Sequence, residues 1–581
     1  MNVQRRQRPA GRREWSWAIV VAGALTFSSL IAGYGFYLSP AQERLGRYAV
    51  LAALGLLLLP VFSALANAGG FRRAVRGSWQ LLSLTLVAGA LLGIARWQAD
   101  GPQSLRVLRM MHVDTPAHLY YGILKVYLVF SLAFHARRLS WRLAYAGLRP
   151  TQVLAGAFTL MIAAGALVLM MPRATPVGGS LGLVDALFTA TSAVCVTGLT
   201  VVDTAAAFSG TGQFALLFLM QIGGLGIMTF AALFALLMGR GLGIKEGVMM
   251  REVMNVDVVA RISSLVLSIL AVTFVLELAG AVLLYILLPQ AGLPVGIRLF
   301  NALFHSVSGF CNAGFSLYGS GFEAFHSDVG VNLVMVGLIV IGGLGFTVHQ
   351  DLVRTFASVI RRRRRRARLR LQTKAVLWVT IVLLVAGTIA FFFLNHGDIS
   401  VLQAFFQSVT SRTAGFHTTP QTDLDDGSHF LTMVLMFIGA APGSTGGGIK
   451  VSTVAIIIAT VLAMMKGRPR TEMFRKTVPD ATVRESIVVA SLSVFVICIA
   501  LMVLLVTETG AFRTLLFEVV SAFGTVGLSL GKTPELTTVG KIIVAMTMFF
   551  GRIGPMAIAL ALAGRVRAAD RVYPSERIMV G

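Results

Sequence analysis

The sequence contains little charge for its length. Only 13% of its 581 residues are Asp, Glu, Lys or Arg, whereas 56% are hydrophobic. A typical globular domain carries about 25% charged residues. So few polar side chains cannot cover a water-exposed surface, which excludes a soluble protein and predicts lipid as the main solvent. Cysteine is also scarce. The chain contains only Cys195, Cys311 and Cys498, which are too few for a disulfide framework.

Acidic residues are half as frequent as basic ones, and the formal net charge is +25. The basic clusters fall in every second loop between apolar runs, which predicts a multi-pass protein of the cytoplasmic (inner) membrane with both termini in the cytoplasm. The run Arg361–Arg366 is expected to contact anionic lipids, in preference to a soluble protein partner. Nucleic acid is not expected as a partner, because no stacking aromatic residues alternate with the basic ones.

Apolar runs of about 20 residues, the length that crosses a bilayer, recur along the whole chain. They predict an all-α polytopic membrane protein with four N-terminal transmembrane helices and eight further spans. The twelve predicted spans are Trp15–Leu38, Tyr48–Ala66, Ser78–Ala95, Leu119–His135, Val153–Met171, Phe214–Met238, Ile262–Leu288, Val331–Val348, Ala375–Leu394, Phe430–Met465 (interrupted), Ser486–Val506 and Val539–Ala563.

One unit repeats four times in the last eight spans. Each copy has a span, a short apolar segment, a polar glycine motif and a second span. The short segments begin with Phe188, Phe304, Phe406 and Phe517, and each has Ser or Thr four residues later, on the same face of a helix. A glycine follows after nine or ten residues. These paired features are Ser192 with Gly198, Ser308 with Gly314, Thr410 with Gly415, and Ser521 with Gly527.

The second spans carry glycine motifs of their own. They read IGGLG at Ile222–Gly226 and Ile341–Gly345, IGAAPG at Ile438–Gly443 and FGRIG at Phe550–Gly554. A phosphate-binding role is excluded, because no strand or βαβ unit surrounds them. Small residues that allow close helix packing are the favoured explanation for the first two motifs.

A span, a half-crossing helix, an irregular polar stretch and a second span place non-helical backbone at membrane depth. Such backbone is tolerated only when it lines a water-filled cavity or is buried in protein. Four copies around one axis predict a pseudo-fourfold pore with backbone carbonyls pointing inward. Neutral oxygens of this kind replace the water of a monovalent cation, and the segments contain no acidic ring for a divalent one.

This ordered set of motifs, with APGSTGGGIK at Ala441–Lys450 and GRIGP at Gly551–Pro555, resembles the Trk/Ktr/HKT superfamily of potassium transporters, above all the prokaryotic Trk and Ktr membrane subunits. The resemblance covers about residues 150–565. All four filter positions are glycine here, and in the family this pattern accompanies potassium transport. Serine at the first position accompanies sodium transport in some plant members, so the resemblance implies K⁺ at the filter glycines. The implied ion-binding filter consists of Cys195, Val196, Thr197, Gly198, Cys311, Asn312, Ala313, Gly314, Arg412, Thr413, Ala414, Gly415, Gly524, Thr525, Val526 and Gly527.

The stretch Gly443–Lys450 interrupts a span with several glycines. It is either a simple helix kink or a longer non-helical loop, and it has more glycines than a kink requires. The resemblance implies a flexible intramembrane loop that gates the pore beneath the filter. Arg552 lies midway along the last span, where insertion of arginine costs about 2.5–3.5 kcal/mol, so it should face the pore or a polar partner such as loop carbonyls or Glu518. The expected gate residues are Gly443, Ser444, Thr445, Gly446, Gly447, Gly448, Lys450 and Arg552.

Three further polar residues are expected to be structural. Glu277 should form a hydrogen bond between packed helices. His305 and His417 flank the filter segments, where a satisfied structural role is favoured over a role in pH response.

The sequence divides into seven predicted regions. They are an N-terminal transmembrane extension (1–150), pore repeat 1 (151–240), pore repeat 2 (262–350), a basic cytoplasmic loop (351–373), pore repeat 3 with the gating loop (374–466), pore repeat 4 (483–565) and a cytoplasmic tail (566–581).

An enzyme is not expected, because the nine histidines are scattered and no HExxH motif occurs. A rocking secondary transporter usually shows two related halves, whereas this chain shows four quarters. Transport of sodium remains an alternative, and so does coupling to Na⁺ or H⁺. No covalent cofactor is expected. The resemblance implies a homodimer and a cytoplasmic ring of nucleotide-binding regulatory subunits, so that a nucleotide would act only through the partner.

Overall fold

The computed structural model describes residues 16–56 with gaps, 150–237 apart from residue 178, 262–288, 292–360 and 368–555. Helix α2 (Ser16–Gly35) coincides with the first predicted span. The predicted spans Ser78–Ala95 and Leu119–His135, most of Tyr48–Ala66, the run Arg361–Arg366 and the tail 566–581 lie outside the described residues.

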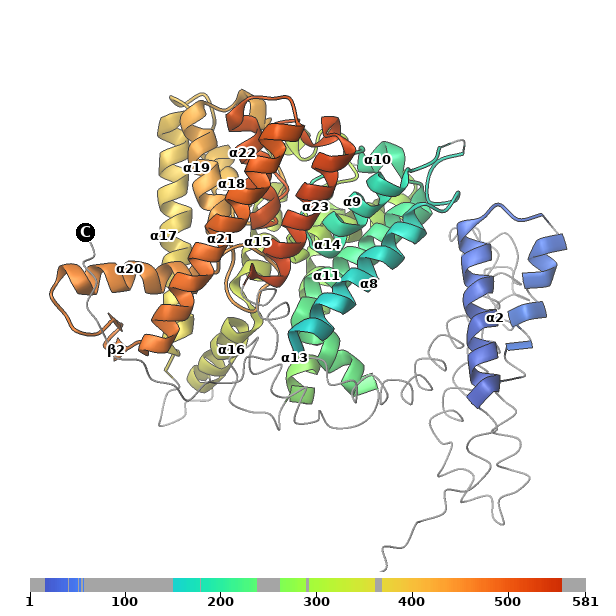
Figure 1. Ribbon diagram of the computed structural model, residues 1–581, viewed down its shortest axis with the longest axis horizontal. Coiled ribbons are helices and arrows are strands. Elements are labelled where there is room, and N and C mark those ends of the chain that lie inside the picture. The colour runs from blue at the N-terminus through green and yellow to red at the C-terminus, as the bar shows by residue number, and fades with distance from the viewer. Residues whose placement is uncertain are drawn as a thin grey trace, which may run out of the picture.

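Long helices occupy the eight predicted spans of the repeat region (Figure 1). Most of their side chains are apolar, as expected for helices surrounded by lipid and protein, although the last helix also carries Lys541 and Arg552. Among the residues that the structure describes, three helical segments are long and apolar enough to cross a membrane, and the bent pair Val329–Leu344 with Phe346–Ile360 is a fourth candidate. The three segments are Ser268–Leu287, Leu371–Leu394 and Asp480–Thr507. The long helices are α8 (Pro150–Leu169), α11 (Gly210–Leu237), α13 (Ile262–Leu287), α15 (Val329–Leu344), α17 (Leu371–Leu394), α19 (Asp426–Phe437) with α20 (Val451–Met465), α21 (Asp480–Thr507) and α23 (Thr538–Ile553).

Four helices of 10–17 residues, called the short helices below, precede the four polar glycine segments, and each ends within two residues of its segment's first position. The phenylalanine that begins each repeated segment is buried, so it anchors each helix in the core; these residues are Phe188, Phe304, Phe406 and Phe517. The four helices are α9 (Leu183–Val194), α14 (Val295–Cys311), α18 (Val401–Thr410) and α22 (Phe512–Gly524).

Small elements complete the described chain. A two-stranded antiparallel hairpin, β1 (Glu472–Met473) with β2 (Lys476–Thr477), follows α20. The remaining pieces are α10 (Thr204–Ala207), α16 (Phe346–Ile360), and the 3₁₀ turns η2 (Glu323–Phe325), η3 (Gln421–Asp423) and η4 (Thr533–Glu535).

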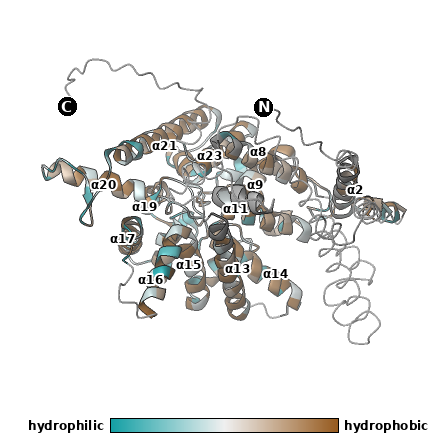
Figure 2. Cartoon of the chain, turned by 90° about the horizontal axis from the view of Figure 1, so that it is seen from below, coloured by the Kyte–Doolittle hydropathy of each residue, from teal (hydrophilic) through white to brown (hydrophobic). Residues whose placement is uncertain are grey.

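The helices surround a common axis in chain order (Figure 2). Each short helix packs against the helix before it, as α9 does on α8 and α14 on α13. The second long helix of each unit then packs against the short helix of the next unit: α11 on α14, α15 on α18, and α19 on α22. Finally α23 packs on α9, so the last unit closes on the first.

The last glycine of each motif lies where the helix bends or ends, or, for Gly443, in the loop that follows α19. Gly226, Gly345, Gly443 and Gly554 all have positive φ, between 57° and 93°, which a side chain with a Cβ rarely adopts. Gly226 bends α11, and α15 meets α16 at an angle of 98°. Most of the predicted span Val331–Val348 is therefore α15, and its last residues lie in α16, after the bend at Gly345.

The interruption predicted within Phe430–Met465 is present. Helix α19 ends at Phe437 and α20 begins at Val451, with an irregular loop between them. In Figure 1, α20 lies across the direction of α19, so the two helices do not form one straight span. The loop between them, residues 438–450, is called the inter-helix loop below.

Candidate functional site

Each short helix is followed by a turn with the same unusual backbone conformation. The second residue of each predicted filter segment has positive φ: Val196 (56°), Asn312 (58°), Thr413 (72°) and Thr525 (50°). Residues other than glycine rarely have positive φ, and for a β-branched residue it is a clear outlier. Strain repeated at one position in four segments indicates that all four backbones follow the same path, held there by their surroundings.

The four predicted filter glycines lie next to one another in a ring. A Cβ atom placed on Gly198 would come within 2.6 Å of the Ala313 carbonyl oxygen, and one on Gly314 within 3.0 Å of the Ala414 carbonyl oxygen. The φ angles of these glycines, 71° to 97°, also exclude most side chains. The ring closes because Gly415 approaches the Val526 carbonyl and Gly527 approaches the Thr197 carbonyl in the same way.

The repeated Ser and Thr of the short helices hold these segments in place. Ser192 Oγ accepts a hydrogen bond from the Gly198 backbone N–H, and Ser521 Oγ accepts one from Gly527, both at 3.1 Å. In the other two segments the hydroxyl donates instead to the carbonyl after the glycine: Ser308 to Phe315 at 2.8 Å and Thr410 to Phe416 at 2.5 Å. The sequence showed the regular spacing of these hydroxyls, but their role was not assigned.

The side chains at the predicted filter positions point away from solvent. All of them are buried, and Arg412 has the largest exposed fraction, 8%. The sequence prediction gave these residues a role through their backbone, and the burial of the Cys195 and Cys311 thiols agrees with a backbone role. The structure thus brings all four predicted segments together at one level of the molecule.

The inter-helix loop lies directly against the filter segments. A Cβ on Gly446 would clash with the Thr413 side chain, and one on Gly447 with the Thr525 side chain. Glycine is therefore required here for close approach. The loop is also bonded to the second unit: the Thr445 hydroxyl donates to the Phe310 carbonyl at 3.2 Å.

Backbone hydrogen bonds fix both ends of this loop. Gly439 N–H donates to the Ile449 carbonyl at 2.9 Å, which closes the loop on itself. Phe346 N–H donates to the Gly443 carbonyl at 3.0 Å, which joins the loop to α16. Lys450 Nζ donates to the Gly446 carbonyl at 2.6 Å, so this cation bonds within the loop. Pro442, Ser444 and the loop glycines therefore form a bonded, non-helical structure rather than a simple kink.

Arg552 lies at the end of α23 and is only 7% exposed. One guanidinium nitrogen donates to the Thr445 carbonyl of the inter-helix loop, and the other donates to the Gly223 carbonyl of α11. The expected alternative of a pairing with Glu518 was wrong. Glu518 accepts hydrogen bonds from Ser529 and Thr533 next to its own filter segment, because these hydroxyls lie closer to it.

The glycine motifs of α11, α15 and α23 pack against the ends of the short helices. A Cβ on Gly223, Gly342 or Gly551 would collide with the carbonyl of the residue that precedes a filter segment, namely Val194, Phe310 and Phe523. The expectation that such glycines serve close helix packing is therefore confirmed for the first two motifs, and the fourth behaves in the same way.

The three remaining polar residues have structural partners. Glu277 on α13 accepts a hydrogen bond from Gln221 on α11 at 3.1 Å. His305 bonds to the Asn301 carbonyl at 2.7 Å and stacks on Tyr318. His417 Nε2 lies 3.2 Å from a carboxylate oxygen of Glu323. Among the residues that the structure describes, no group of three or more His, Cys, Asp or Glu side chains is arranged to hold a metal ion.

Comparison with known proteins agrees with this architecture. The family described as "TrkH: Cation transport protein" matches residues 139–567. The chain belongs to this family. Ktr system potassium uptake protein B of Bacillus subtilis is 38% identical over 74% of this chain and 97% of its own length. Potassium/sodium uptake protein NtpJ of Enterococcus hirae is 36% identical over 75% of this chain and 98% of its own length.

The TrkH-family fold is also found among solved structures. The crystal structure of the potassium transporter TrkH from Vibrio parahaemolyticus matches with a TM-score of 0.61 at 19% identity, covering 83% of this chain and 98% of that chain. Together with the apolar helices, membership of the TrkH family makes this chain a multi-pass membrane protein of a cation transport family.

Proposed function

We propose that this protein takes up potassium across the cytoplasmic membrane through a pore formed by four membrane-pore-membrane repeats. The observation that carries the proposal is the ring of Gly198, Gly314, Gly415 and Gly527, in which each glycine touches the next segment and the last touches the first. Four such segments around one axis can surround an ion with backbone carbonyls in place of its water. The names of the relatives support potassium as the ion.

The filter in this proposal consists of the sixteen residues predicted from the sequence, with K⁺ bound at the level of the glycines. The positive φ at the second and fourth positions of each segment supports this assignment, because it gives four equivalent backbones. The inter-helix loop is the proposed gate. Its glycines abut Thr413 and Thr525, so an ion that leaves the filter on this side meets the loop first.

Arg552 and Lys450 add positive charge to the proposed gate. Arg552 is buried and Lys450 is half-buried, and both bond to carbonyls of the loop. A fixed positive charge in a low-dielectric path repels a permeating cation. The arginine therefore limits flow in two ways: by its charge and by tying the loop to α11.

Several properties of the transporter rest on the family and on the charge distribution. They are a homodimer, a cytoplasmic ring of nucleotide-binding regulatory subunits, both termini in the cytoplasm, and no enzymatic activity. Anionic lipids are the proposed contact of the basic loops. Transport of sodium is the second candidate function, favoured by the name of the Enterococcus relative.

Growth complementation tests the function. We expect expression of this chain, with its regulatory subunit, to restore growth at low potassium in a bacterium that lacks its own potassium uptake systems. Sodium-stimulated growth or sodium accumulation in the same strain would favour the second candidate. Absence of rescue by a well-expressed, membrane-inserted protein would contradict the proposal.

A further inference from the structure

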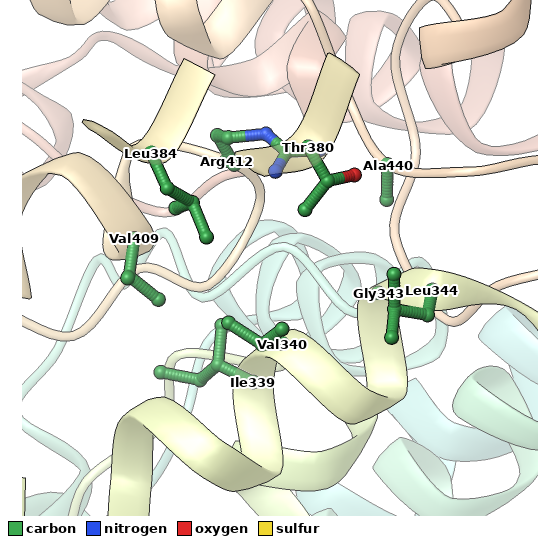
Figure 3. A pocket seen from close by; sticks show the side chains of 9 residues that line it. All are labelled: Ile339, Val340, Gly343, Leu344, Thr380, Leu384, Val409, Arg412 and Ala440. Carbon is green, nitrogen blue, oxygen red and sulfur yellow. The ribbon is translucent and has the colours of Figure 1, made fainter. Parts of the chain in front are cut away.

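A small cavity lies beside the third filter segment, between α15, α17 and α18 (Figure 3). Its volume of about 20 Å³ has room for one water-sized species. Most of its wall is apolar. The lining residues are Ile339, Val340, Gly343, Leu344, Thr380, Leu384, Val409, Arg412 and Ala440.

The cavity has two polar side chains, the guanidinium of Arg412, which only donates hydrogen bonds, and the hydroxyl of Thr380, which can donate or accept. Arg412 is 8% exposed and Thr380 is 6% exposed, and Figure 3 shows them next to each other on the same side of the cavity. The buried Nε of Arg412 has no hydrogen-bond partner. Within the described ranges, no carboxylate or carbonyl accepts from the Arg412 guanidinium, and none accepts from the Thr380 hydroxyl.

A buried arginine without an acceptor requires an explanation. Guanidinium stays protonated in proteins, and removing such a charge from water without a partner is strongly unfavourable. The other buried arginine of the site, Arg552, shows the usual solution, because both of its terminal nitrogens reach carbonyls. At Arg412 the acceptor is a species other than the described protein groups, either a water molecule or a bound anion.

We propose that the Arg412–Thr380 cavity binds a small monatomic anion of the chloride class. Among the described residues no carboxylate pairs with the Arg412 guanidinium, and this uncompensated charge favours a negative species over water. The cavity volume favours a monatomic ion over a phosphate or carboxylate group. The apolar remainder of the wall, which includes Ile339 and Val340, suits a weakly hydrated halide. The anion neutralises Arg412 where the chain enters the filter segment that ends at Gly415.

The bound anion has a consequence for cation transport. Without it, the charge of Arg412 is uncompensated beside the filter, and a buried charge acts strongly on a nearby cation. Cation occupancy of the filter should then fall. Anion occupancy of the cavity therefore sets how readily the filter holds a cation, which is a form of regulation that the transport proposal itself does not include.

Direct binding is the first test, and it needs no transport assay. Purified full-length protein is heated in potassium chloride, bromide or gluconate at constant ionic strength. We expect chloride and bromide to raise the melting temperature by about 2–4 °C relative to gluconate. Crystals grown in bromide should show an anomalous peak beside Arg412 and Thr380. Equal melting temperatures and absence of the peak would overturn the proposal.

Variants of the cavity residues test whether the halide-dependent rise in melting temperature comes from this cavity. Arg412→Gln should abolish the halide-dependent rise in melting temperature, and Thr380→Val should weaken it. Thr388→Val is the matched control on α17, because the Thr388 hydroxyl already donates to the Leu384 carbonyl at 2.7 Å. If Arg412→Gln fails to fold, Thr380→Val against Thr388→Val still decides. A halide effect that is the same in the Thr380 and Thr388 variants would place the anion elsewhere and refute this site.

Transport then tests the consequence. In proteoliposomes, replacing internal and external chloride by gluconate should lower potassium flux about five- to tenfold in the unmodified protein. The flux of Arg412→Gln should not respond to the replacement. Halide binding together with chloride-independent flux would refute the regulatory role but keep the site. Because binding is measured separately, failure of the transport proposal would be recognised as such.

Discussion

The guanidinium of Arg552 donates to the carbonyl oxygen of Thr445, a residue 107 positions earlier in the chain. The same side chain also reaches the Gly223 carbonyl of α11, which is 329 positions away. One arginine thus joins the last helix, the inter-helix loop and the glycine motif of the first unit. Because α23 also packs on α9, this contact lies where the circle of helices closes.

Replacing Arg552 should loosen the loop. Loss of a hydrogen bond from a charged donor costs about 1.5–3 kcal/mol, which corresponds to a roughly tenfold or greater shift in the loop equilibrium. We expect Arg552→Gln to raise rubidium flux in proteoliposomes by about tenfold. Arg552→Lys keeps the charge but loses the two-pronged geometry, so its flux should lie between the two. Equal flux in all three proteins would contradict a closing role for this residue.

Shortening the loop should have a similar effect by a different route. Deletion of Gly446–Gly448 removes the residues that abut Thr413 and Thr525 and frees the Lys450 ammonium from its carbonyl. We expect higher flux with an unchanged ratio of potassium to sodium uptake, since the filter backbone is held by other residues. The selectivity ratio is the internal control. Unchanged flux would remove the gate proposal and leave the filter proposal intact.

A side chain at a filter glycine should disturb the filter backbone. At Gly198, φ is 92° and an added Cβ would lie 2.6 Å from the Ala313 carbonyl oxygen. We expect Gly198→Ser to lower selectivity for potassium over sodium about tenfold, a change of roughly 1.4 kcal/mol. Uptake of rubidium in competition with sodium measures this ratio. Gly210→Ser is the control, because an added Cβ there meets no atom within 4 Å. Equal selectivity in both variants would contradict the prediction.

The hydroxyls behind the filter should contribute to stability. Ser521→Ala leaves the Gly527 backbone N–H without its acceptor, and an unsatisfied buried donor costs about 1–3 kcal/mol. We expect a melting temperature lower by several degrees and a weaker preference for potassium. Ser521→Thr keeps the hydroxyl, as Thr410 does naturally in the third segment, and should restore both properties. A Ser521→Ala protein with unchanged melting and selectivity would count against this role.

Much of the architecture followed from the sequence. Helices occupy most of the predicted spans of the repeat region, because their apolar runs match the length of a bilayer crossing; the last helix ends at Ile553, before the predicted Ala563. The filter segments were predicted from the repeated Phe, Ser or Thr, and Gly, because the same residue types at the same spacing in four segments indicate the same local structure in each. The bend at Gly345 was missed, because IGGLG is compatible with either close packing or a break.

Contacts between distant segments were decided by the tertiary structure alone. Spacing placed Ser192 and Ser521 on one face of each helix, but only the fold shows that their hydroxyls meet the Gly198 and Gly527 N–H groups. Likewise the sequence placed an arginine at position 552 inside a span and offered two kinds of partner. The packing of α23 places the Arg552 guanidinium next to a loop carbonyl and not next to Glu518.

The sequence by itself determined that the chain lies in lipid, that it crosses the bilayer many times, and that one unit recurs four times. Local patterning suffices for these features because hydropathy and glycine spacing act within a single segment. The closure of the Gly198, Gly314, Gly415 and Gly527 ring, and the isolation of the Arg412 cation, depend on how segments hundreds of residues apart pack. Such packing reflects the shapes of all the intervening side chains, which no local pattern records.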